Sequence, residues 1–181
     1  MMNRIISAID NGILFLCVAN SARSQIAEGL AREMFGPSVR VQSAGSKPAR
    51  VHPLAVEVMK EIGIDISSQR AKSISDVDMS RVSLVVTLCT DEVCAIRTSP
   101  SIHLHWFLPN PAIHKAGYED IDSFRKTRDE LKLKIGVLYK QYNCVPVRTI
   151  NRNQAPALSG AAGFFAPFRK LTLRRVASAA M

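Results

Sequence analysis

Residues 13–24 read Ile-Leu-Phe-Leu-Cys-Val-Ala-Asn-Ser-Ala-Arg-Ser. The apolar half of this stretch is rich in strand-forming residues and predicts a strand that ends at Cys17. Five residues lead to Arg23, and Ser24 begins a helical pattern. We therefore expect a strand, a tight loop and a helix start. The backbone N–H groups of such a loop and of the helix N-terminus point at one spot, where they stabilise an anion.

Two side chains of this stretch suit oxyanion chemistry. Cys17 stands where a positive environment stabilises the thiolate, which is the nucleophilic form of cysteine. Arg23 can hold two oxygens of a tetrahedral oxyanion in its planar fork. The alternative is a buried cysteine followed by an unrelated surface arginine, but the strand before and the helix after make that coincidence rare. The expected catalytic residues here are Cys17, Arg23 and Ser24, and the expected oxyanion-binding residues are Val18, Ala19, Asn20, Ser21, Ala22 and Arg23.

Apolar periodicity in the rest of the chain predicts strands and helices in alternation. The expected further strands are residues 39–44, 84–88 and 102–106, and the expected helices run from Ser24 to the stop at Gly36-Pro37, from Pro53 to Gly63, and from Ile121 to about Tyr142. This alternation predicts an α/β fold, a single three-layer domain whose four-stranded parallel sheet carries helices on both faces. The loop after Cys17 then lies at the carboxyl edge of the sheet, where open α/β sheets bind ligands.

The stretch from Cys17 to Ser24 resembles the Cys-x5-Arg-Ser loop of the low-molecular-weight tyrosine phosphatase superfamily. Residues 24–29, Ser-Gln-Ile-Ala-Glu-Gly, and residues 43–45, Ser-Ala-Gly, are similar to the segments that follow it in that family. The resemblance extends from about Gly12 to Tyr142 and implies the family's strand order, 2-1-3-4.

The chain has four cysteines, too few for a disulfide scaffold, and no Cys-x2-Cys pair that would indicate zinc. Cys89 follows the third expected strand, and Cys94 comes five residues later. Each could be an inert apolar filler. In the 2-1-3-4 order, however, the first and third strands are neighbours about 4.8 Å apart, so Cys17 and Cys89 leave one sheet edge within reach of a disulfide. We expect Cys144, at the end of the resemblance, to have no catalytic role.

The Cys89 segment, with Leu104-His105-Trp106 and Pro111-Ala112, is similar to the thioredoxin-coupled or glutaredoxin-coupled arsenate reductases of the superfamily. The resemblance implies that Cys17 attacks arsenate to form a thiol-arsenate adduct and that Cys89 then attacks Cys17 and expels arsenite. Cys94 next attacks Cys89, which leaves a disulfide for an external reductant. The implied partners are arsenate, or a phosphate ester, and thioredoxin or glutaredoxin. No cofactor is implied.

The chain departs from the family at the general acid. Asn110-Pro111 stands where the superfamily has an Asp-Pro pair. A carboxamide can hold a hydrogen bond but cannot deliver a proton, and such proton transfer contributes typically 10²- to 10⁴-fold in rate. This handicaps phosphatase chemistry, in which a phenolate must leave. His105, His114 or Asp91 could substitute, or could be ordinary solvated residues.

A second departure concerns a cation site that some reductases of this family have. It uses an asparagine in the loop, a glutamate in the following helix and oxygen-bearing residues after the second helix. Asn20 and Glu28 match, but Arg70 and Lys72 occupy the later region. Because these cations repel K⁺, we expect no metal. Asn20 is still expected to help hold the loop, since asparagine tolerates left-handed backbone geometry.

The composition changes near residue 144, so we expect a catalytic domain at 1–143 and a basic tail at 144–181. Six of the net nine positive charges lie in the last 37 residues, which contain no acid. A disordered, solvated tail is expected, the alternative being a basic amphipathic helix on an anionic membrane or nucleic acid. No stretch approaches the roughly 20 apolar residues of a membrane span, and Asp10 and Asn11 interrupt the signal-like N-terminus. We expect a cytoplasmic protein.

Three functions remain open at this point. Arsenate reduction is favoured by Cys89 and Cys94, because phosphatases of the same fold need no such pair. A tyrosine phosphatase would need an acid from elsewhere than Asn110. A weakened oxyanion-binding or regulatory protein would bind without turnover. The sequence identifies neither the reductant, nor the oligomeric state, nor the role of the tail.

Overall fold

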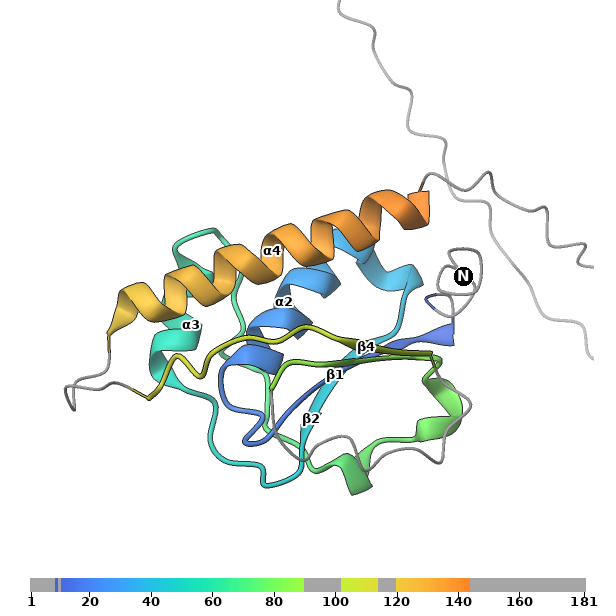
Figure 1. The fold of residues 1–181 in the computed structure, drawn as a ribbon, viewed down its shortest axis with the longest axis horizontal. Coiled ribbons are helices and arrows are strands. Elements are labelled where there is room, and N and C mark those ends of the chain that lie inside the picture. The colour runs from blue at the N-terminus through green and yellow to red at the C-terminus, as the bar shows by residue number, and fades with distance from the viewer. Residues whose placement is uncertain (1–8, 10, 90–101, 114–119, 144–181) are drawn as a thin grey trace, which may run out of the picture. The chain divides into compact units, whose positions relative to one another are not determined.

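The computed structural model describes residues 9, 11–89, 102–113 and 120–143 (Figure 1). Its four strands form one parallel sheet: β1 (Ile13–Cys17), β2 (Val41–Gly45), β3 (Leu84–Thr87) and β4 (Ile102–His105). The strand order is β2-β1-β3-β4, which confirms the 2-1-3-4 order implied by the family resemblance. The two central strands are therefore those that lead to Cys17 and to Cys89.

Three α-helices pack against one another on the same side of the sheet (Figure 1). They are α2 (Arg23–Phe35), α3 (Pro53–Lys60) and α4 (Ile121–Asn143), and the 3₁₀ helices are η1 (Gly36–Ser38), η2 (Ile74–Asp76) and η3 (Met79–Arg81). The first α-helix begins at Arg23, one residue before the expected start at Ser24. The reason is that Ser24 does not cap the helix: Ala22 is the N-cap, without a side-chain bond, and the Ser24 hydroxyl contacts Cys17 instead.

β1 is buried on both of its faces, which explains its continuous apolar run. Ile13, Phe15 and Cys17 join the larger core, which the three α-helices also line. Leu14 and Leu16 face a smaller core, where residues 74–82, including η2 and η3, cover the sheet. In the described part of the chain, 3₁₀ helices thus cover this second face. β4 alternates half-buried and exposed residues, as expected of an edge strand.

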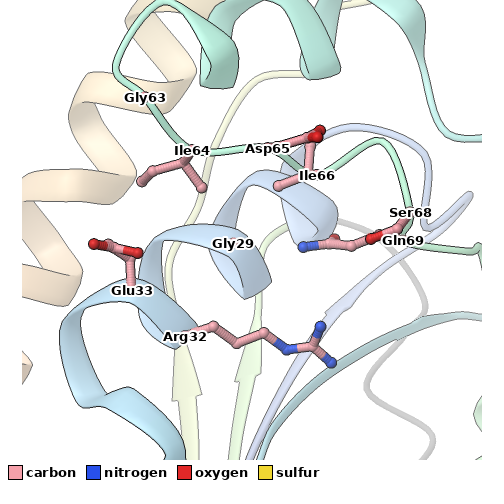
Figure 2. Close-up of a pocket in the computed structure, with 9 residues that line it drawn as sticks. All are labelled: Gly29, Arg32, Glu33, Gly63, Ile64, Asp65, Ile66, Ser68 and Gln69. Carbon is pink, nitrogen blue, oxygen red and sulfur yellow. The ribbon is translucent and has the colours of Figure 1, made fainter.

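The helix that follows the loop is held close to residues 63–66, and Gly29 makes this approach possible (Figure 2). A Cβ on Gly29 would lie 2.6 Å from Ile66 Cγ2 and 3.0 Å from Met59 Cε. Ile66 and Met59 are both fully buried. Any larger residue at position 29 would push α2 away from this part of the core, and the N-terminus of α2 carries the loop.

Charged hydrogen bonds fasten α4 to the end of α3. The Glu61 carboxylate accepts from Arg125 Nε at 3.0 Å and from Arg128 Nη1 at 2.8 Å. Arg128, 8% exposed, also donates to the Val58 carbonyl at 2.9 Å. The hydrogen bond from Arg125 is the main cause that lowers the pKa of Glu61 below its ordinary value of 4.5.

We expect Glu61→Gln to lower the melting temperature slightly at neutral pH. A carboxylate whose pKa is lowered on folding stabilises the fold above its unfolded-state pKa, and this contribution disappears as the pH falls through the folded-state pKa. The difference between Glu61→Gln and the parent should therefore shrink as the pH falls below about 4.5, the ordinary pKa of this carboxyl. Thermal unfolding across acidic pH measures it, with the exposed Glu57→Gln on the same helix as the control. A difference independent of pH would contradict the assignment.

The structure bears on the expected absence of a membrane span but not on the expected domain boundary. None of the described helices is long and apolar enough to cross a membrane. Asp91, Cys94, His114, Cys144 and the whole of residues 144–181 lie outside the described residues, so the domain boundary stays a prediction.

Candidate oxyanion-binding site

Cys17 ends β1 at the carboxyl edge of the sheet, and its side chain is 2% exposed. The backbone N–H of Asn20 points at its Sγ from 3.2 Å, and the Ser24 Oγ lies 2.9 Å away. A thiolate cannot donate, so toward an ionised Cys17 the Ser24 hydroxyl must be the donor. Both contacts stabilise negative charge on the sulfur, and the thiolate is the form of cysteine that acts as a nucleophile.

The peptide planes of the loop are turned by hydrogen bonds to its outer side. The carbonyls of Val18, Ala19 and Ser21 accept from backbone N–H groups of segment 47–52, at 2.8 to 2.9 Å. Because the N–H and C=O of a peptide point in opposite directions, holding the carbonyls outward directs loop N–H groups inward. The outer hydrogen bonds thus give a physical reason for inward N–H groups, and the binding of an anion by them stays a prediction.

Gly45 at the end of β2 allows the loop to lie against the neighbouring strand. A Cβ at this position would lie 2.4 Å from the Val18 oxygen and 2.8 Å from the Asn20 nitrogen. Both distances are shorter than real side-chain contacts, so only glycine fits here without moving the loop.

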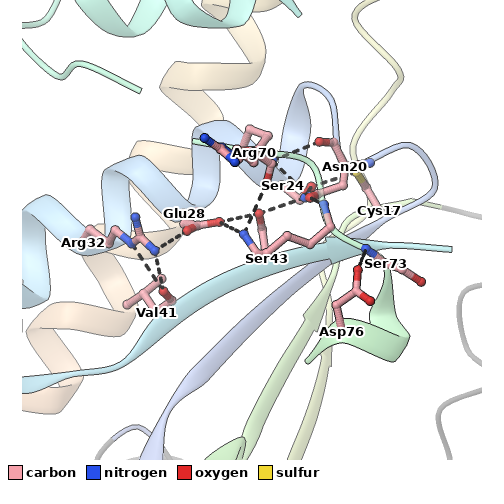
Figure 3. A network of polar contacts seen from close by, with 12 residues as sticks. Cys17, Asn20, Ser24, Glu28, Arg32, Val41, Ser43, Arg70, Ser73 and Asp76 are labelled. Carbon is pink, nitrogen blue, oxygen red and sulfur yellow. Dashed lines mark hydrogen bonds and ion pairs between the residues drawn. The ribbon is translucent and has the colours of Figure 1, made fainter. Parts of the chain in front are cut away.

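Asn20 has a φ of 46°, the only positive value among the described residues other than glycine. This confirms the expectation that Asn20 takes a left-handed conformation. Its fully buried side chain donates from Nδ2 to Ser24 Oγ and Ser43 Oγ, both at 2.8 Å (Figure 3). Its Oδ1 accepts from the backbone N–H of Lys72 at 2.8 Å. The hydrogen bonds of Nδ2 and Oδ1 together hold Asn20 in its left-handed conformation.

Arg23 is the first residue of α2 and is 9% exposed. Its Nη1 donates to the Leu108 carbonyl at 3.0 Å and to the Leu88 carbonyl at 3.4 Å. These carbonyls precede Asn110 and Cys89 in the chain, so one guanidinium ties the loop to both segments. Nε and Nη2 take no part in these two bonds.

The loop surrounds a cavity of about 250 Å³. Its lining comprises Cys17, Val18, Ala19, Ser21, Ala22, Arg23, Asn110 and Ala112. Asn110, at the position where the resemblance expects the general acid, therefore lines the same cavity as Cys17. Its Oδ1 accepts from the Ala112 N–H at 3.2 Å. Among the described residues, no carboxylate or imidazole lines this cavity. His105 is exposed and bonds to Thr87 Oγ1 instead.

Cys89 comes after Leu88, which follows β3, and it lies beside the end of β1. The Leu88 N–H donates to the Leu16 carbonyl at 2.9 Å, which extends the pairing of the two strands by one residue. Cys89 is half-buried and packs against both cores. Cys17 and Cys89 thus leave neighbouring strands at one edge, whereas Cys94 lies outside the described residues.

Some parts of the site were not predicted from the sequence. Segment 47–52 contributes only backbone N–H groups, which leave no side-chain signal. The Ser-Ala-Gly motif does not by itself indicate the role of Ser43, although a serine in a buried strand is a signal for a hydrogen-bonding task. Across residues 11–89, 102–113 and 120–143, no group of three His, Cys, Asp or Glu side chains could hold a metal ion.

A cysteine that begins a tight loop between a strand and a helix, at the edge of a 2-1-3-4 parallel sheet, defines a phosphatase-like class of protein. The chain belongs to the low molecular weight phosphotyrosine protein phosphatase family, whose model matches residues 12–147. An arsenate reductase of Staphylococcus xylosus is 41% identical over 125 residues, which cover 68% of this chain and 92% of that protein.

Solved structures show the same relationship. A structure described as an arsenate reductase in the phosphate binding state has a TM-score of 0.63 and 31% identity, and the match covers 72% of this chain and 98% of that one. A thioredoxin-dependent arsenate reductase of Corynebacterium glutamicum has a TM-score of 0.59 and 29% identity, with 78% and 70% of the two chains covered.

Proposed function

We propose that this chain is an arsenate reductase in which Cys17 is the nucleophile and Cys89 and Cys94 complete a disulfide relay. The observation that carries the proposal is the position of Cys89, which comes after β3 and Leu88 and lies next to the strand that ends at Cys17. A phosphatase of this fold has no need of a second thiol there. The similarity to curated and solved arsenate reductases supports the same reaction.

The first step takes place in the loop. Arsenate binds to the inward N–H groups and to Arg23, whose fork matches two oxygens of a tetrahedral anion. The Cys17 thiolate attacks arsenic, a sulfur–arsenic bond forms, and one oxygen leaves as water. The amide of Asn110 is not an acid, so the leaving oxygen takes its protons from the arsenate itself and from solvent.

The next steps transfer two electrons from thiols to arsenic. The Cys89 thiolate attacks the sulfur of Cys17, the sulfur–arsenic bond breaks, and its electron pair stays on arsenic, which leaves as arsenite. The Cys94 thiolate then attacks the sulfur of Cys89 and releases the Cys17 thiolate. An external dithiol reduces the Cys89–Cys94 disulfide. Thioredoxin is the reductant we propose, with a glutaredoxin as the alternative.

Asn110 is the specific observation against efficient phosphatase turnover. It lines the same cavity as Cys17, and the cavity lining holds no described acid in its place. A phenolate leaving group depends on proton delivery, whereas thiol-driven release of arsenite depends on Cys89. Asn110 therefore handicaps phosphate ester hydrolysis but does not interrupt the thiol relay.

We expect Asn110→Asp to raise aryl phosphate hydrolysis by up to about 10²-fold and arsenate reduction by less than about tenfold. The new carboxyl would face the leaving group, and the phenolate gains most from a proton. Steady-state assays of both reactions measure this, and an aryl phosphate with a very good leaving group is the internal control that should respond least. Equal gains in all assays would contradict the assignment of position 110.

We also propose a domain boundary and a cellular location. Residues 1–143 form the catalytic domain, and residues 144–181 form a solvated basic tail. A relay that ends in a disulfide needs a reducing compartment, so we place the protein in the cytoplasm.

One comparison tests the function. Arsenite release by the reduced chain is measured with a thioredoxin system and with a glutaredoxin system, beside hydrolysis of an aryl phosphate. The proposal expects multiple turnovers of arsenate with one of the dithiol systems and weak hydrolysis. Strong hydrolysis without arsenite release would identify a phosphatase, and oxyanion binding without either reaction would identify a binding protein.

A further inference from the structure

A buried carboxylate lies behind the loop. Glu28, on α2, has a side chain that is only 1% exposed. Removing an ionised carboxylate from water is costly unless it is paired and hydrogen-bonded. Here Oε2 accepts from the Ser43 hydroxyl and lies 3.5 Å from the Lys72 ammonium, while Oε1 is paired with the Arg32 guanidinium (Figure 3).

A chain of hydrogen bonds with a defined direction joins this carboxylate to the nucleophile. Because the Ser43 hydroxyl donates its one proton to Glu28, its oxygen can only accept from Asn20 Nδ2. The same amide donates to the Ser24 oxygen, so the proton of Ser24 is left to point at Cys17. The buried negative charge therefore orients every group as far as the thiolate.

Lys72 contacts two members of this series of hydrogen bonds, Asn20 and Glu28. Its backbone N–H donates to Asn20 Oδ1, and its ammonium faces Glu28. The ammonium also contacts the Arg70 carbonyl at 3.4 Å, and the Lys72 carbonyl accepts from the Gly45 N–H at 2.9 Å. One residue thus links the carboxylate, the loop asparagine and the strand on which the loop rests.

These residues do not fit a bound monovalent cation. The family resemblance points to such a cation at the loop asparagine and the helix glutamate, here Asn20 and Glu28. The Glu28 carboxylate already has two cationic partners, Lys72 and Arg32. A third positive charge there would be repelled, with no further described carboxylate paired to it.

We propose that the Lys72 ammonium acts as a tethered substitute for a monovalent cation and that Lys72 is a positioning residue for the anion-binding loop. It compensates Glu28, keeps the Ser43 and Asn20 bonds in their observed direction, and so holds the loop N–H groups inward. The loop is therefore independent of potassium. The proposal rests on the proposed function only where it takes the bound anion to be arsenate.

The test measures binding of inorganic phosphate to the reduced full chain, which needs no turnover. Titrations are carried out in KCl and in NaCl at equal ionic strength. The parent chain is expected to bind phosphate equally in both salts. Lys72→Met should weaken phosphate binding in NaCl by about tenfold, as loss of an outer-shell partner commonly does, and KCl should restore part of the loss. Lys132→Met, an exposed lysine on α4, is the matched control and should change nothing.

A second variant separates charge from packing and covers a failure of Lys72→Met to fold. Lys72→Arg keeps the positive charge and should bind phosphate equally in KCl and in NaCl. The proposal is overturned if Lys72→Arg gains from potassium, if the parent binds phosphate better in KCl than in NaCl, or if folded Lys72→Met binds like the parent.

The arsenate assay then shows whether the loss of Lys72 affects mainly KM or mainly kcat. For Lys72→Met we expect KM for arsenate to rise more than kcat falls, because Lys72 positions the loop that binds the anion while Cys17 and Cys89 are both retained. An unchanged KM with a lowered kcat would contradict a positioning role. If the parent chain does not reduce arsenate, the proposed function fails, while the phosphate titrations still decide the role of Lys72.

Discussion

Cys17→Ser is expected to lose arsenate reduction by at least about 10⁴-fold while it still binds oxyanions. A serine hydroxyl ionises far less readily than a thiol and cannot form the sulfur–arsenic bond or the later disulfide. The inward N–H groups and Arg23 remain, because the loop is held from outside by segment 47–52 and Gly45. Isothermal titration with phosphate and an arsenite-release assay measure the two properties separately.

The matched control is Cys144→Ser, which removes a thiol to which we assign no role. It should reduce arsenate at the parent rate. Retained reduction by Cys17→Ser would overturn the assignment of the nucleophile, and loss of phosphate binding in that variant would show that the sulfur itself, not the backbone, organises the loop.

The central part of the fold was predictable because it rests on local patterns. The apolar run into Cys17 is buried on both faces of β1, and continuous burial is what a continuous apolar run requires. The spacing from Cys17 to Arg23 is likewise local, and the structure brings both to one cavity. The strand order was not contained in these patterns and came from the family resemblance.

The contacts that make the loop rigid were not predictable, since they join distant segments. The sequence indicated that Lys72 disfavours a bound cation, but not that its ammonium lies beside the buried Glu28. Nor did any pattern show that Arg23 donates to the carbonyls of Leu88 and Leu108. Carbonyl acceptors are present at every residue, so only the three-dimensional fold can select among them.

Ser24 illustrates how a local rule fails at a functional position. A serine before a helical pattern normally signals an N-cap. Here its hydroxyl lies 2.9 Å from Cys17, and the helix begins one residue earlier with Ala22 at the uncapped position. The hydroxyl that would have capped the helix end contacts Cys17, so the first helical N–H groups have no side-chain cap.

Cys89→Ser is expected to lower steady-state arsenate reduction by at least about 10³-fold and to stop the reaction before arsenite is released. The adduct on Cys17 needs a thiol within reach, and Cys89 is the thiol that the pairing of Leu88 with Leu16 brings to the same edge. Neighbouring parallel strands lie about 4.8 Å apart, inside the Cα separation of about 7 Å that a disulfide tolerates.

Cys94→Ser is the comparison variant, because it should stop the reaction at a later step than Cys89→Ser. It retains Cys89, so it should release one equivalent of arsenite and then stall with Cys17 and Cys89 joined by a disulfide. Intact-mass spectrometry of the two quenched variants distinguishes an arsenic adduct in Cys89→Ser from a loss of two hydrogens in Cys94→Ser. Repeated thioredoxin-driven turnover by Cys89→Ser would show that another thiol attacks the adduct, and the position of Cys89 beside the loop would then have no part in the reaction.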